Sequence, residues 1–472
     1  MQSKITLRKI YTAFFFLGVF YIPFNDFEGL SFLGEYKNEA ATYFFLIGFL
    51  ILIIESLLKG KINIPYRNSL SIVLILFIVW TFLSTLINIE TVLENYYKQT
   101  SGINRYIRQT ISLLISAVIF TIFFWNVIRN YRLDKIFLLI RKTLLFSLIF
   151  VTVYGSIEIA IVYFGMSFLK PIFEAFEVFP FVNTNYMGNQ RVSISSVTYE
   201  VPALGNYLIT VGPWMLSYIL TEKRWYKFIP SLCVLVLMYF SDSRTAMICI
   251  LIELLLFIVL LLYDIRYRKT TVKALQIVTA SVLLLLVVKS NDIIELIDER
   301  TDRLNFSKNL TENVSNKTRF GMQYASFQVF KENPIVGVGL GQDTYHKIYH
   351  YPYWSTHNNW EFDLYYTNLQ VKSFPSGYNI YTRLLSELGI VGIFLFLTFI
   401  FLCIYYSILF WKYADNRDKY MGVILILSFV GLSVNWMQTD FFRQYGIWLC
   451  LALIIRIRMM HRAENEKKIK LA

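Results

Sequence analysis

Residues 388–410 read LGIVGIFLFLTFIFLCIYYSILF, and no charged side chain interrupts this run. A helix needs about 20 consecutive apolar residues to cross the roughly 30 Å hydrocarbon core of a bilayer. Similar runs occur at 41–58, 69–86 and 421–434. Uninterrupted apolar runs suit helices, whereas the strands of a membrane barrel alternate apolar and polar residues. The sequence therefore predicts an all-α polytopic membrane protein.

The composition agrees with this class. Hydrophobic residues make up 56% of the 472 residues, aromatic residues 18% and charged residues only 16%, which is too few polar side chains for a water-soluble globule. The net charge of +13 could suggest a nucleic-acid binder, but the basic residues gather in short connections and tails. We therefore expect no nucleic-acid partner. All four cysteines lie in apolar runs without CxxC spacing, so we expect neither a disulfide nor a metal site.

We predict about twelve transmembrane helices. The first is expected to be retained, because no small-residue cleavage site follows it. Lysine and arginine recur on alternate connections and in both tails, so the positive-inside rule places both termini in the cytoplasm. The predicted spans are centred in residues 10–24, 41–58, 69–88, 109–128, 136–164, 204–221, 228–240, 245–263, 274–288, 388–410, 420–437 and 445–455.

The longer connections fall on the opposite side, which we expect to face outward. We divide the chain into helices 1–9 with an outer loop near 165–203 (residues 1–289), a large extracytoplasmic loop with short helices (290–387), and helices 10–12 with a basic tail (388–472). The inner connections are too short to build a pocket, and no glycine-rich phosphate loop opens a helix after a strand. Function is therefore expected on the outer face, in contact with the lipid bilayer.

Three arginines oppose the charge bias because they fall in outer connections beside spans: Arg191, Arg244 and Arg319. An arginine at membrane depth costs about 2.5–3.5 kcal/mol on insertion scales unless it reaches water or an anion. Each could instead snorkel to a lipid phosphate, and Arg244 could pair with Asp242. If the three converge, their guanidinium groups match phosphate oxygens bidentately. The natural anion for a membrane enzyme without a nucleotide loop is a lipid pyrophosphate.

The second large outer connection combines turn and aromatic chemistry. A helix is expected from about 318 to 331, followed by Asn333-Pro334 and by glycines at 337, 339 and 341. Glycine permits positive φ and lets backbone amides approach a ligand, although such a cluster is more often a simple turn. Residues 349–366 carry five tyrosines and two tryptophans. Such rings stack on sugar faces and also suit the lipid interface, and the sequence leaves both alternatives open.

Taken in order, these segments resemble the O-antigen polymerase and O-antigen ligase family of bacterial envelope glycosyltransferases. The resemblance covers about residues 185–395 and is carried by motifs that are specific in their order. They are Arg191 with Glu200 and Pro202, the turn Ser243-Arg244-Thr245-Ala246, Arg319 with Asn333-Pro334-Ile335-Val336-Gly337-Val338-Gly339, and Asn379 with Glu387, Gly389 and Gly392.

The resemblance implies a GT-C-like glycosyltransferase in the bacterial inner (cytoplasmic) membrane. Such an enzyme transfers a growing glycan from undecaprenyl pyrophosphate onto a lipid-linked oligosaccharide repeat unit, with no cofactor, and its product is O-antigen, capsule or exopolysaccharide. The implied partners are the lipid-linked oligosaccharides, a chain-length regulator and a repeat-unit flippase. Two alternatives stay open: a ligase that moves glycan to lipid A core or protein, and a flippase of lipid-linked oligosaccharides. Transporters tend to show related halves, and we find no internal repeat in this sequence.

One departure separates the two branches of the family. Ligases have a histidine immediately before the asparagine of the last motif, and this chain has Tyr378 there. An unperturbed tyrosine, with a pKa of about 10, is a poor general base near neutral pH. The only His-Asn pair, His357-Asn358, does not fit the spacing to Gly389 and Gly392. A polymerase is therefore the better interpretation.

Roles can be assigned on this basis. Arg191, Arg244 and Arg319 are predicted to bind the pyrophosphate, where negative charge builds up as the glycosidic bond breaks. Glu200 is the first candidate for the general base. Its alternative is a structural carboxylate at a helix amino terminus, stabilised by the helix dipole.

The last motif supplies the remaining candidates. Tyr378, counted among the catalytic candidates, and Asn379 are predicted to hold the sugar or the lipid phosphate through hydrogen bonds. The alternative for Asn379 is capping of the helix that follows it. Glu387 is predicted to contribute to substrate binding or to orient its helix. Gly337 and Gly339 complete the predicted substrate-binding set.

Overall fold

The computed structural model describes residues 6–183, 193–288, 313–371 and 374–471. Within these residues a helix lies at each of the twelve predicted spans, which confirms the all-α architecture. These helices are α1 (Leu7–Phe20), α2 (Ala40–Leu58), α3 (Ser69–Ile87), α5 (Gly102–Leu114) continuing through the π-helical η2 (Ile115–Phe120) into α6 (Thr121–Ile128), α7 (Leu133–Val162), α9 (Val201–Thr221), α10 (Ile229–Ser241), α11 (Arg244–Tyr263), α12 (Ile265–Val288), α18 (Ile380–Tyr413), α19 (Lys419–Asn435) and α20 (Tyr445–Leu471).

Six of the described helical stretches are long and apolar enough to cross a membrane, judged by length and composition. They are α2, α3, α5 through α6, α7, α11 and α18. The shorter α10 and α19 are also apolar. α9 is buried along most of its length, from Leu204 to Ser217. Protein surrounds it, which is compatible with the proline, asparagine and hydroxyl side chains that it carries.

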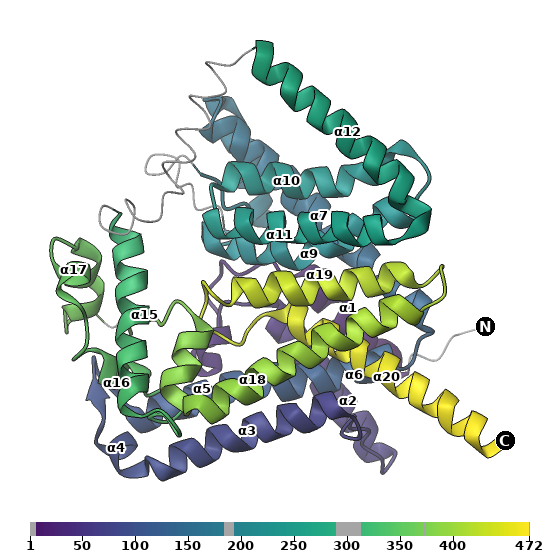
Figure 1. Ribbon diagram of the computed structural model, residues 1–472. Helices are drawn as coiled ribbons and strands as arrows, with labels where there is room; N and C mark the ends of the chain where they lie inside the picture. Colours follow the sequence, from purple (N-terminus) through teal and green to yellow (C-terminus); the bar gives the residue numbers. More distant parts are fainter. Residues whose placement is uncertain (1–5, 184–192, 289–312, 372–373, 472) are drawn as a thin grey trace.

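The long helices run side by side, and a smaller helical layer lies across one end of them (Figure 1). In this layer, α15 (Val314–Glu332) crosses the ends of the long helices and is followed by α16 (Asp343–Lys347) and α17 (Tyr353–Thr356). The sequence predicted α15 to within a few residues. α1 begins and α20 ends at the opposite end of the bundle. The compartment that each end faces stays a prediction.

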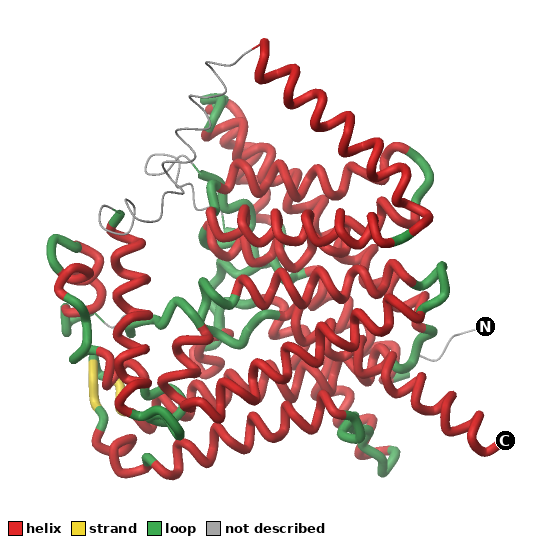
Figure 2. Tube along the Cα trace, viewed as in Figure 1, coloured by secondary structure: helices red, strands yellow, loops and turns green. Residues whose placement is uncertain are grey.

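Short elements connect these helices. β1 (Tyr96–Tyr97) and β2 (Thr100–Ser101) form an antiparallel hairpin, drawn in yellow in Figure 2. Lys98 and Gln99 have positive φ values of 45° and 58°, as the central residues of a type I′ turn require. Lys98 Nζ donates to the carbonyl of Tyr365, so the hairpin holds the segment that follows α17. The other short helices are η1 (Ser31–Tyr36), α4 (Ile89–Glu94), η3 (Ser167–Leu169), α8 (Lys170–Glu174), η4 (Ala175–Val178), η5 (Trp225–Phe228) and the π-helical η6 (Phe362–Thr367).

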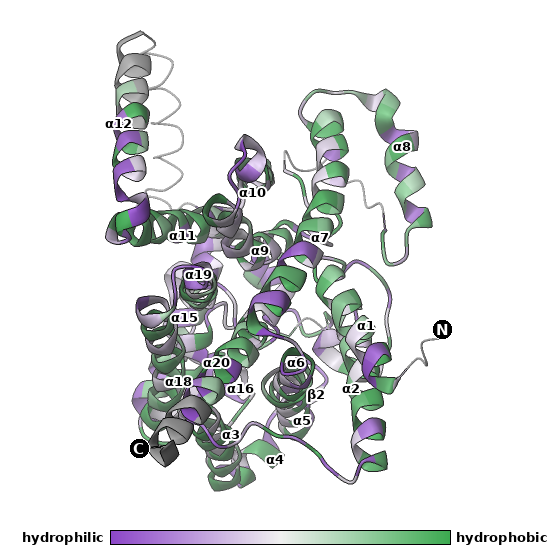
Figure 3. Cartoon of the chain, turned by 90° about the vertical axis from the view of Figure 1, so that its right-hand side faces the viewer, coloured by the Kyte–Doolittle hydropathy of each residue, from purple (hydrophilic) through white to green (hydrophobic). Residues whose placement is uncertain are grey.

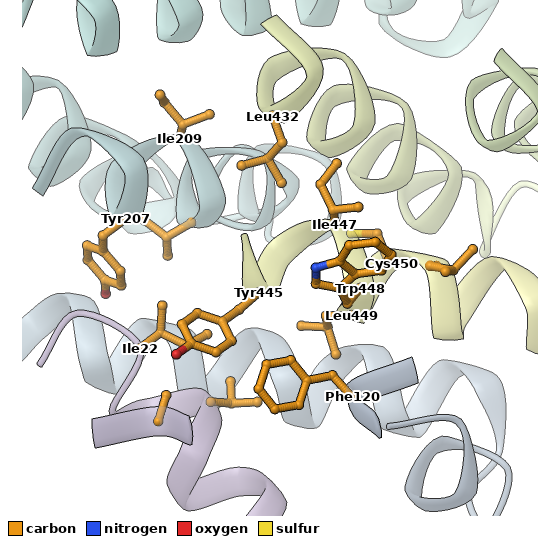
Figure 4. Close-up of a cluster of buried hydrophobic side chains, with 14 of the residues drawn as sticks. Ile22, Phe120, Tyr207, Ile209, Leu432, Tyr445, Ile447, Trp448, Leu449 and Cys450 are labelled. Atoms are coloured by element: carbon orange, nitrogen blue, oxygen red, sulfur yellow. The ribbon is translucent and has the colours of Figure 1, made fainter. Parts of the chain in front are cut away.

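The hydrophobic core lies in the middle of the bundle. Figure 4 shows part of it, where Tyr207 of α9, Leu432 of α19, Trp448 of α20 and Phe120 of η2 pack around one another. All four side chains are buried. Because lipid tails are as apolar as these residues, close packing contributes more to helix association here than removal from water does.

Apolar residues cover most of the long helices (Figure 3). α12 packs against α11, and beyond its first turn it stands apart from the bundle. Its first turn is basic: Arg266 pairs with Asp264 at 2.6 Å and donates to the carbonyl of Asn416 at 2.7 Å. α12 covers the ninth predicted span, but it is not among the six described stretches that are long and apolar enough to cross a membrane.

α18 is bent at Gly389, whose φ of 64° and ψ of −166° are not helical. A bend of this kind leaves carbonyl groups of the preceding turn without helical donors. The loop that follows α15 replaces them: Val338 N donates to the Ser386 carbonyl at 3.1 Å, and Gly339 N donates to the Glu387 carbonyl at 2.8 Å.

The same bend binds two further segments. Trp80 Nε1 of α3 donates to the Leu388 carbonyl at 2.9 Å, and Ile390 N donates to the Pro334 carbonyl at 2.9 Å. An unsatisfied backbone group costs several kcal/mol in hydrocarbon, so these hydrogen bonds fix the smaller helical layer firmly to α3 and α18.

Candidate active site

A cavity of about 510 Å³ lies where α15 meets the ends of α9, α11 and α19. This volume is within the range of about 300–1,000 Å³ that is typical of small-molecule sites. Most of its lining side chains are polar or charged, and the charged ones are Arg244, Arg319, Asp242 and Glu361. Charged groups facing a cavity among membrane helices are expensive and are usually functional.

Arg244 reaches the cavity through the tight turn between α10 and α11. Asp242 ends α10 in the left-handed conformation, with φ of 52°. Ser243 follows it and caps α11 by accepting a hydrogen bond from the Ala246 amide at 3.3 Å. Arg244 is then the first residue of α11, and its side chain is exposed in the cavity wall. Asp242 lines the same cavity, so pairing between Asp242 and Arg244 stays an alternative.

Arg319 reaches the cavity from the second turn of α15. Its guanidinium carbon lies 5.4 Å from the ring centroid of Tyr378, a cation–π distance. The Tyr378 hydroxyl is hydrogen-bonded to the Tyr366 hydroxyl. Tyr378 has a φ of 53°, which is rare for a bulky residue and costs about 1–3 kcal/mol unless its surroundings enforce it.

The protonation of Tyr378 follows from its surroundings. Burial raises the pKa of Tyr378, and the hydrogen bond from Tyr366 and the charge of Arg319 offset this only in part. The hydroxyl therefore stays protonated at neutral pH. It can donate a hydrogen bond, but its deprotonated form, the only form that could act as a base, is even less populated than in a free tyrosine.

Three helices begin at the cavity. Residues of their first turns line it: Val201 of α9, Arg244 of α11 and Ser315 of α15. A helix amino terminus carries unpaired N–H groups and a partial positive charge. Asn313 caps α15 by accepting a hydrogen bond from the Asn316 amide at 3.2 Å. With the two arginines, these termini favour an anion in the cavity.

Two features offset this positive charge. α10 and α19 end at the cavity, and the carboxylates of Asp242 and Glu361 line it. The cavity therefore places acceptors for a proton beside donors for an anion, which is the combination that acid–base chemistry on a phosphate-linked substrate requires.

Glu200 lies beside this cavity and not in its wall. It precedes α9 and lines a smaller space of about 60 Å³. The two spaces share Pro202, Asn206 and Thr439. The Glu200 carboxylate accepts a hydrogen bond from the Tyr199 hydroxyl, and its side chain makes no capping hydrogen bond to α9. Its predicted role as a base stays a prediction.

The loop before Glu200 is anchored on both sides. The Glu158 carboxylate of α7 accepts from the Ser195 amide at 3.2 Å and from the Ser196 amide at 2.8 Å. Asn25 Oδ1 accepts from the Tyr199 amide at 3.1 Å. These contacts fix the start of α9 relative to α7 and to the end of α1. Arg191 lies outside the described residues, so the convergence on one cavity is seen for Arg244 and Arg319.

Asn379 caps α18, as the alternative interpretation held. Its Oδ1 accepts from the Tyr381 amide at 2.9 Å and from the Thr382 amide at 3.3 Å. Its Nδ2 donates to Gln323 Oε1 of α15 at 3.3 Å. Both polar ends of the side chain are therefore used within the protein, and direct substrate binding by Asn379 stays a prediction.

The other predicted substrate-binding residues hold the smaller helical layer in place. The Gly339 amide donates to the Glu387 carbonyl, and the Gly337 amide donates to the Asn333 carbonyl at 3.1 Å. The Glu387 side chain is only 2% exposed and pairs with Arg383 Nε at 3.0 Å. None of the three is among the described residues that line the cavity. Their geometry assigns them packing roles, and substrate binding by them stays a prediction.

Arg383 was not predicted from the sequence. Its buried guanidinium pairs with Glu387, donates to Gln109 Oε1 of α5 at 2.7 Å and donates to the backbone carbonyl of Asp440. The Asp440 carboxylate accepts from the Gly377 amide at 2.5 Å, directly before Tyr378. The spacing of Arg383 and Glu387, four residues apart on one helix, was a usable signal for an ion pair.

The ionisation of Asp440 supports this linkage. Burial raises the pKa of Asp440, but the charges of Arg383 and Lys347 and the hydrogen bond from the Gly377 amide outweigh it, so the pKa is held below its usual value. Asp440 is therefore ionised at neutral pH. It holds the Gly377 turn against the connection between α19 and α20.

Arg443 is the second residue that was missed. It lines the smaller space together with Glu200 and donates to Glu39 Oε1 at 3.1 Å and to the Glu35 carbonyl at 2.6 Å. Arg443 also opposes the charge bias, like the three predicted arginines, because the predicted topology places residues 438–444 outside. Its connection is short, and it was overlooked for that reason.

Comparison with known protein families agrees with this geometry. Residues 229–397 match the family model described as O-antigen ligase. The matched segment runs from α10 into α18, so it contains Arg244, Arg319 and Tyr378, whereas Arg191 and Glu200 precede it. No curated protein matches the chain. The family match supports the O-antigen polymerase and ligase family and a membrane protein of envelope polysaccharide synthesis, and it is compatible with either activity.

Proposed function

We propose that this chain, as a member of the O-antigen polymerase and ligase family, is a polysaccharide polymerase. It transfers a growing glycan from undecaprenyl pyrophosphate onto a lipid-linked oligosaccharide repeat unit at the outer face of the bacterial cytoplasmic membrane. The observation that supports this most strongly is one polar cavity that combines Arg244, Arg319 and the amino termini of three helices.

The proposed chemistry follows from that cavity. As the bond between the anomeric carbon and the pyrophosphate oxygen breaks, negative charge grows on the leaving group. Arg244 and Arg319 bind this charge, and one donor of this kind is worth a factor of about 10²–10³ in rate. The acceptor hydroxyl forms the new bond to the anomeric carbon and loses its proton to a carboxylate. Glu361 shares the cavity with both arginines, so it joins Glu200 as a candidate for that base.

A ligase is the second candidate, because the matching family model carries that description. Tyr378 argues against the histidine mechanism of ligases, since burial raises its pKa further from neutrality. A polymerase needs its two lipid-linked chains to be positioned beside the leaving group, and a cavity at the ends of the long helices is suited to that.

The test uses purified protein in lipid nanodiscs with lipid-linked repeat units as both donor and acceptor. The wild-type protein is expected to give a ladder of lengthened products. Arg244→Ala and Arg319→Ala are each expected to lower the initial rate about 100-fold or more. Arg224→Ala is the matched control, because Arg224 is exposed at the opposite end of α9, and its rate is expected to equal that of the wild type.

Each other outcome points elsewhere. Transfer only to lipid A core or protein, with no ladder, identifies a ligase. Movement of lipid-linked glycan across the bilayer without extension identifies a flippase. Normal ladders from both arginine variants rule out the pyrophosphate role. Glu361→Gln and Glu200→Gln, compared in the same assay, identify the base as the variant with the larger loss.

A further inference from the structure

The aromatic segment at 349–366 is divided in two by the structure. One part faces inward: Phe362 and Tyr366 are buried with Met322 of α15, and Tyr351 and Tyr378 pack against them. This small cluster supports the Tyr378 ring that contacts Arg319. The inward rings are therefore explained by the site already described.

The other part faces outward and is not explained by packing. Tyr353 is 73% exposed and Trp360 is 57% exposed. They belong to two ring pairs: Tyr353 is stacked on His357 with centroids 4.7 Å apart, and Trp360 meets the edge of Tyr365 with centroids 6.2 Å apart. We call these four residues the aromatic platform. Large exposed aromatic side chains that gather in one segment mark an interaction site.

The position of α17 separates the two open explanations of these rings. α17 lies on the side of α15 that faces away from the long helices (Figure 1). A helix with its side chains is about 10 Å across, so α15 stands between α17 and the ends of the membrane-crossing helices. Tyr353, which starts α17, therefore lies on the far side of α15 from these helices, a position that favours sugar binding over the lipid interface.

The platform adjoins a cavity residue in the sequence. Glu361 lines the cavity with Arg319, and Trp360 is the residue before it. In the sequence, Asn358, which is exposed and has a φ of 51°, falls between the two ring pairs. Flat rings flanked by amide, imidazole and carboxylate groups suit a sugar, whose C–H faces stack on rings and whose hydroxyl groups need polar partners.

We propose that the aromatic platform binds the glycan chain outside the cavity and holds it while successive repeat units are added. This inference rests on the proposed polymerase function, because a polymerase keeps a growing chain bound while the next repeat unit is added. Binding at the platform affects how long the product becomes, whereas Arg244 and Arg319 affect whether transfer occurs.

The test measures binding and product length separately. Full-length protein in nanodiscs is titrated calorimetrically with oligosaccharides released by mild acid from the host's surface polysaccharide, which carry no lipid or pyrophosphate. The double variant Tyr353→Ala/Trp360→Ala is expected to bind them about tenfold more weakly. In the polymerase assay it is expected to make the first addition but to lose the longest products. Trp360→Phe, which keeps a ring, is expected to restore most of both properties.

Trp225→Ala is the matched control, because Trp225 is 77% exposed in η5 at the opposite end of α9. Unchanged oligosaccharide binding and unchanged product length in the double variant overturn the proposal. So does strong quenching of the wild-type fluorescence by brominated lipids that disappears in Trp360→Phe, since it would place this ring in the bilayer. If the wild type binds oligosaccharide but transfers none, the platform stands and the polymerase assignment fails.

Discussion

The guanidinium of Arg319 lies over the ring of Tyr378, with the central carbon 5.4 Å from the ring centroid. The tyrosine occupies a strained backbone position, with φ of 53°, and its hydroxyl is hydrogen-bonded to the Tyr366 hydroxyl. Strain of this kind persists where the surrounding structure enforces it, often at functional sites. Tyr378 therefore acts on the site through the arginine that it orients.

Substitutions at Tyr378 separate its ring from its hydroxyl. Tyr378→Phe keeps the cation–π contact, so its transfer rate is expected to stay within about fivefold of the wild type. Tyr378→Ala frees Arg319, and a cation–π contact of about 0.5–2 kcal/mol corresponds to a loss of roughly 2-fold to 30-fold. Initial rates with lipid-linked repeat units give the comparison, with thermal midpoints to exclude unfolding. A Phe variant as slow as the Ala variant would show that the hydroxyl contacts substrate.

An alanine substitution should destabilise the protein more at Gly337 than at a glycine of the same conformation that has no close neighbours. Its φ is 75°, and a methyl group there would overlap the Glu387 carbonyl of α18. Gly165 has a φ of 66° with nothing within 4 Å of the added methyl. Gly165→Ala is expected to cost only the backbone term of about 1–2 kcal/mol. Gly337→Ala adds an overlap of about 1–3 kcal/mol. Denaturant titration in detergent measures both, and equal losses would contradict the close packing of Gly337 against Glu387.

The long helices could be predicted because each apolar run indicates a transmembrane helix without information from the rest of the chain. The run at 388–410 needs no partner to be recognised as a span. Its extension back to Ile380, through the bend at Gly389, was not predicted as one helix. Gly389 is a weak helix former, and its neighbours Ile390 and Leu388 bind Pro334 and Trp80, which are distant in sequence.

The site could be predicted in part for a similar reason. Arg244 and Arg319 were identified because an outer cation opposes the charge rule, a signal visible in one residue. The glycines after Asn333 were assigned to a ligand because positive φ looks the same in sequence whether the amide meets a phosphate or a carbonyl of α18. The contact of Arg383 with Asp440 joins distant parts of the chain, which sequence spacing does not reveal.

Substitutions of Glu253 and Gly431 should have strongly non-additive effects on the free energy of unfolding. Glu253 of α11 is 1% exposed, and neither of its carboxylate oxygens has a hydrogen-bond partner among the described residues. Gly431 of α19 and Gly212 of α9 leave room for this carboxyl group. Gly431→Ala would place a methyl group on Glu253 Oε1, so it is expected to lower the stability by about 1–3 kcal/mol.

The double-mutant cycle tests this packing. Glu253→Ala removes the carboxyl group, so Gly431→Ala should cost little in that background, and the coupling energy should fall within about 0.5–3 kcal/mol. The readout is the free energy of unfolding in detergent for the wild type, both single variants and the double variant. Strict additivity would mean that the two helices separate enough to accept the methyl group without help.

His346, in α16 of the smaller helical layer, should make the stability of the protein sensitive to mild acid. Burial lowers the pKa of His346 and the charge of His350 lowers it further, whereas Asp343 and Glu332 raise it. Because the folded pKa is depressed, the unfolded chain takes up the proton first. The contribution of His346 to stability is therefore fully present above the unfolded pKa of about 6.5 and is lost as the pH falls toward the folded value.

His346→Gln is expected to flatten the fall in thermal midpoint between pH 7 and 5. His350→Gln serves as the companion variant, since His350 pairs with Glu332 at 3.2 Å. A thermal midpoint that falls as steeply in His346→Gln as in the wild type would contradict the prediction.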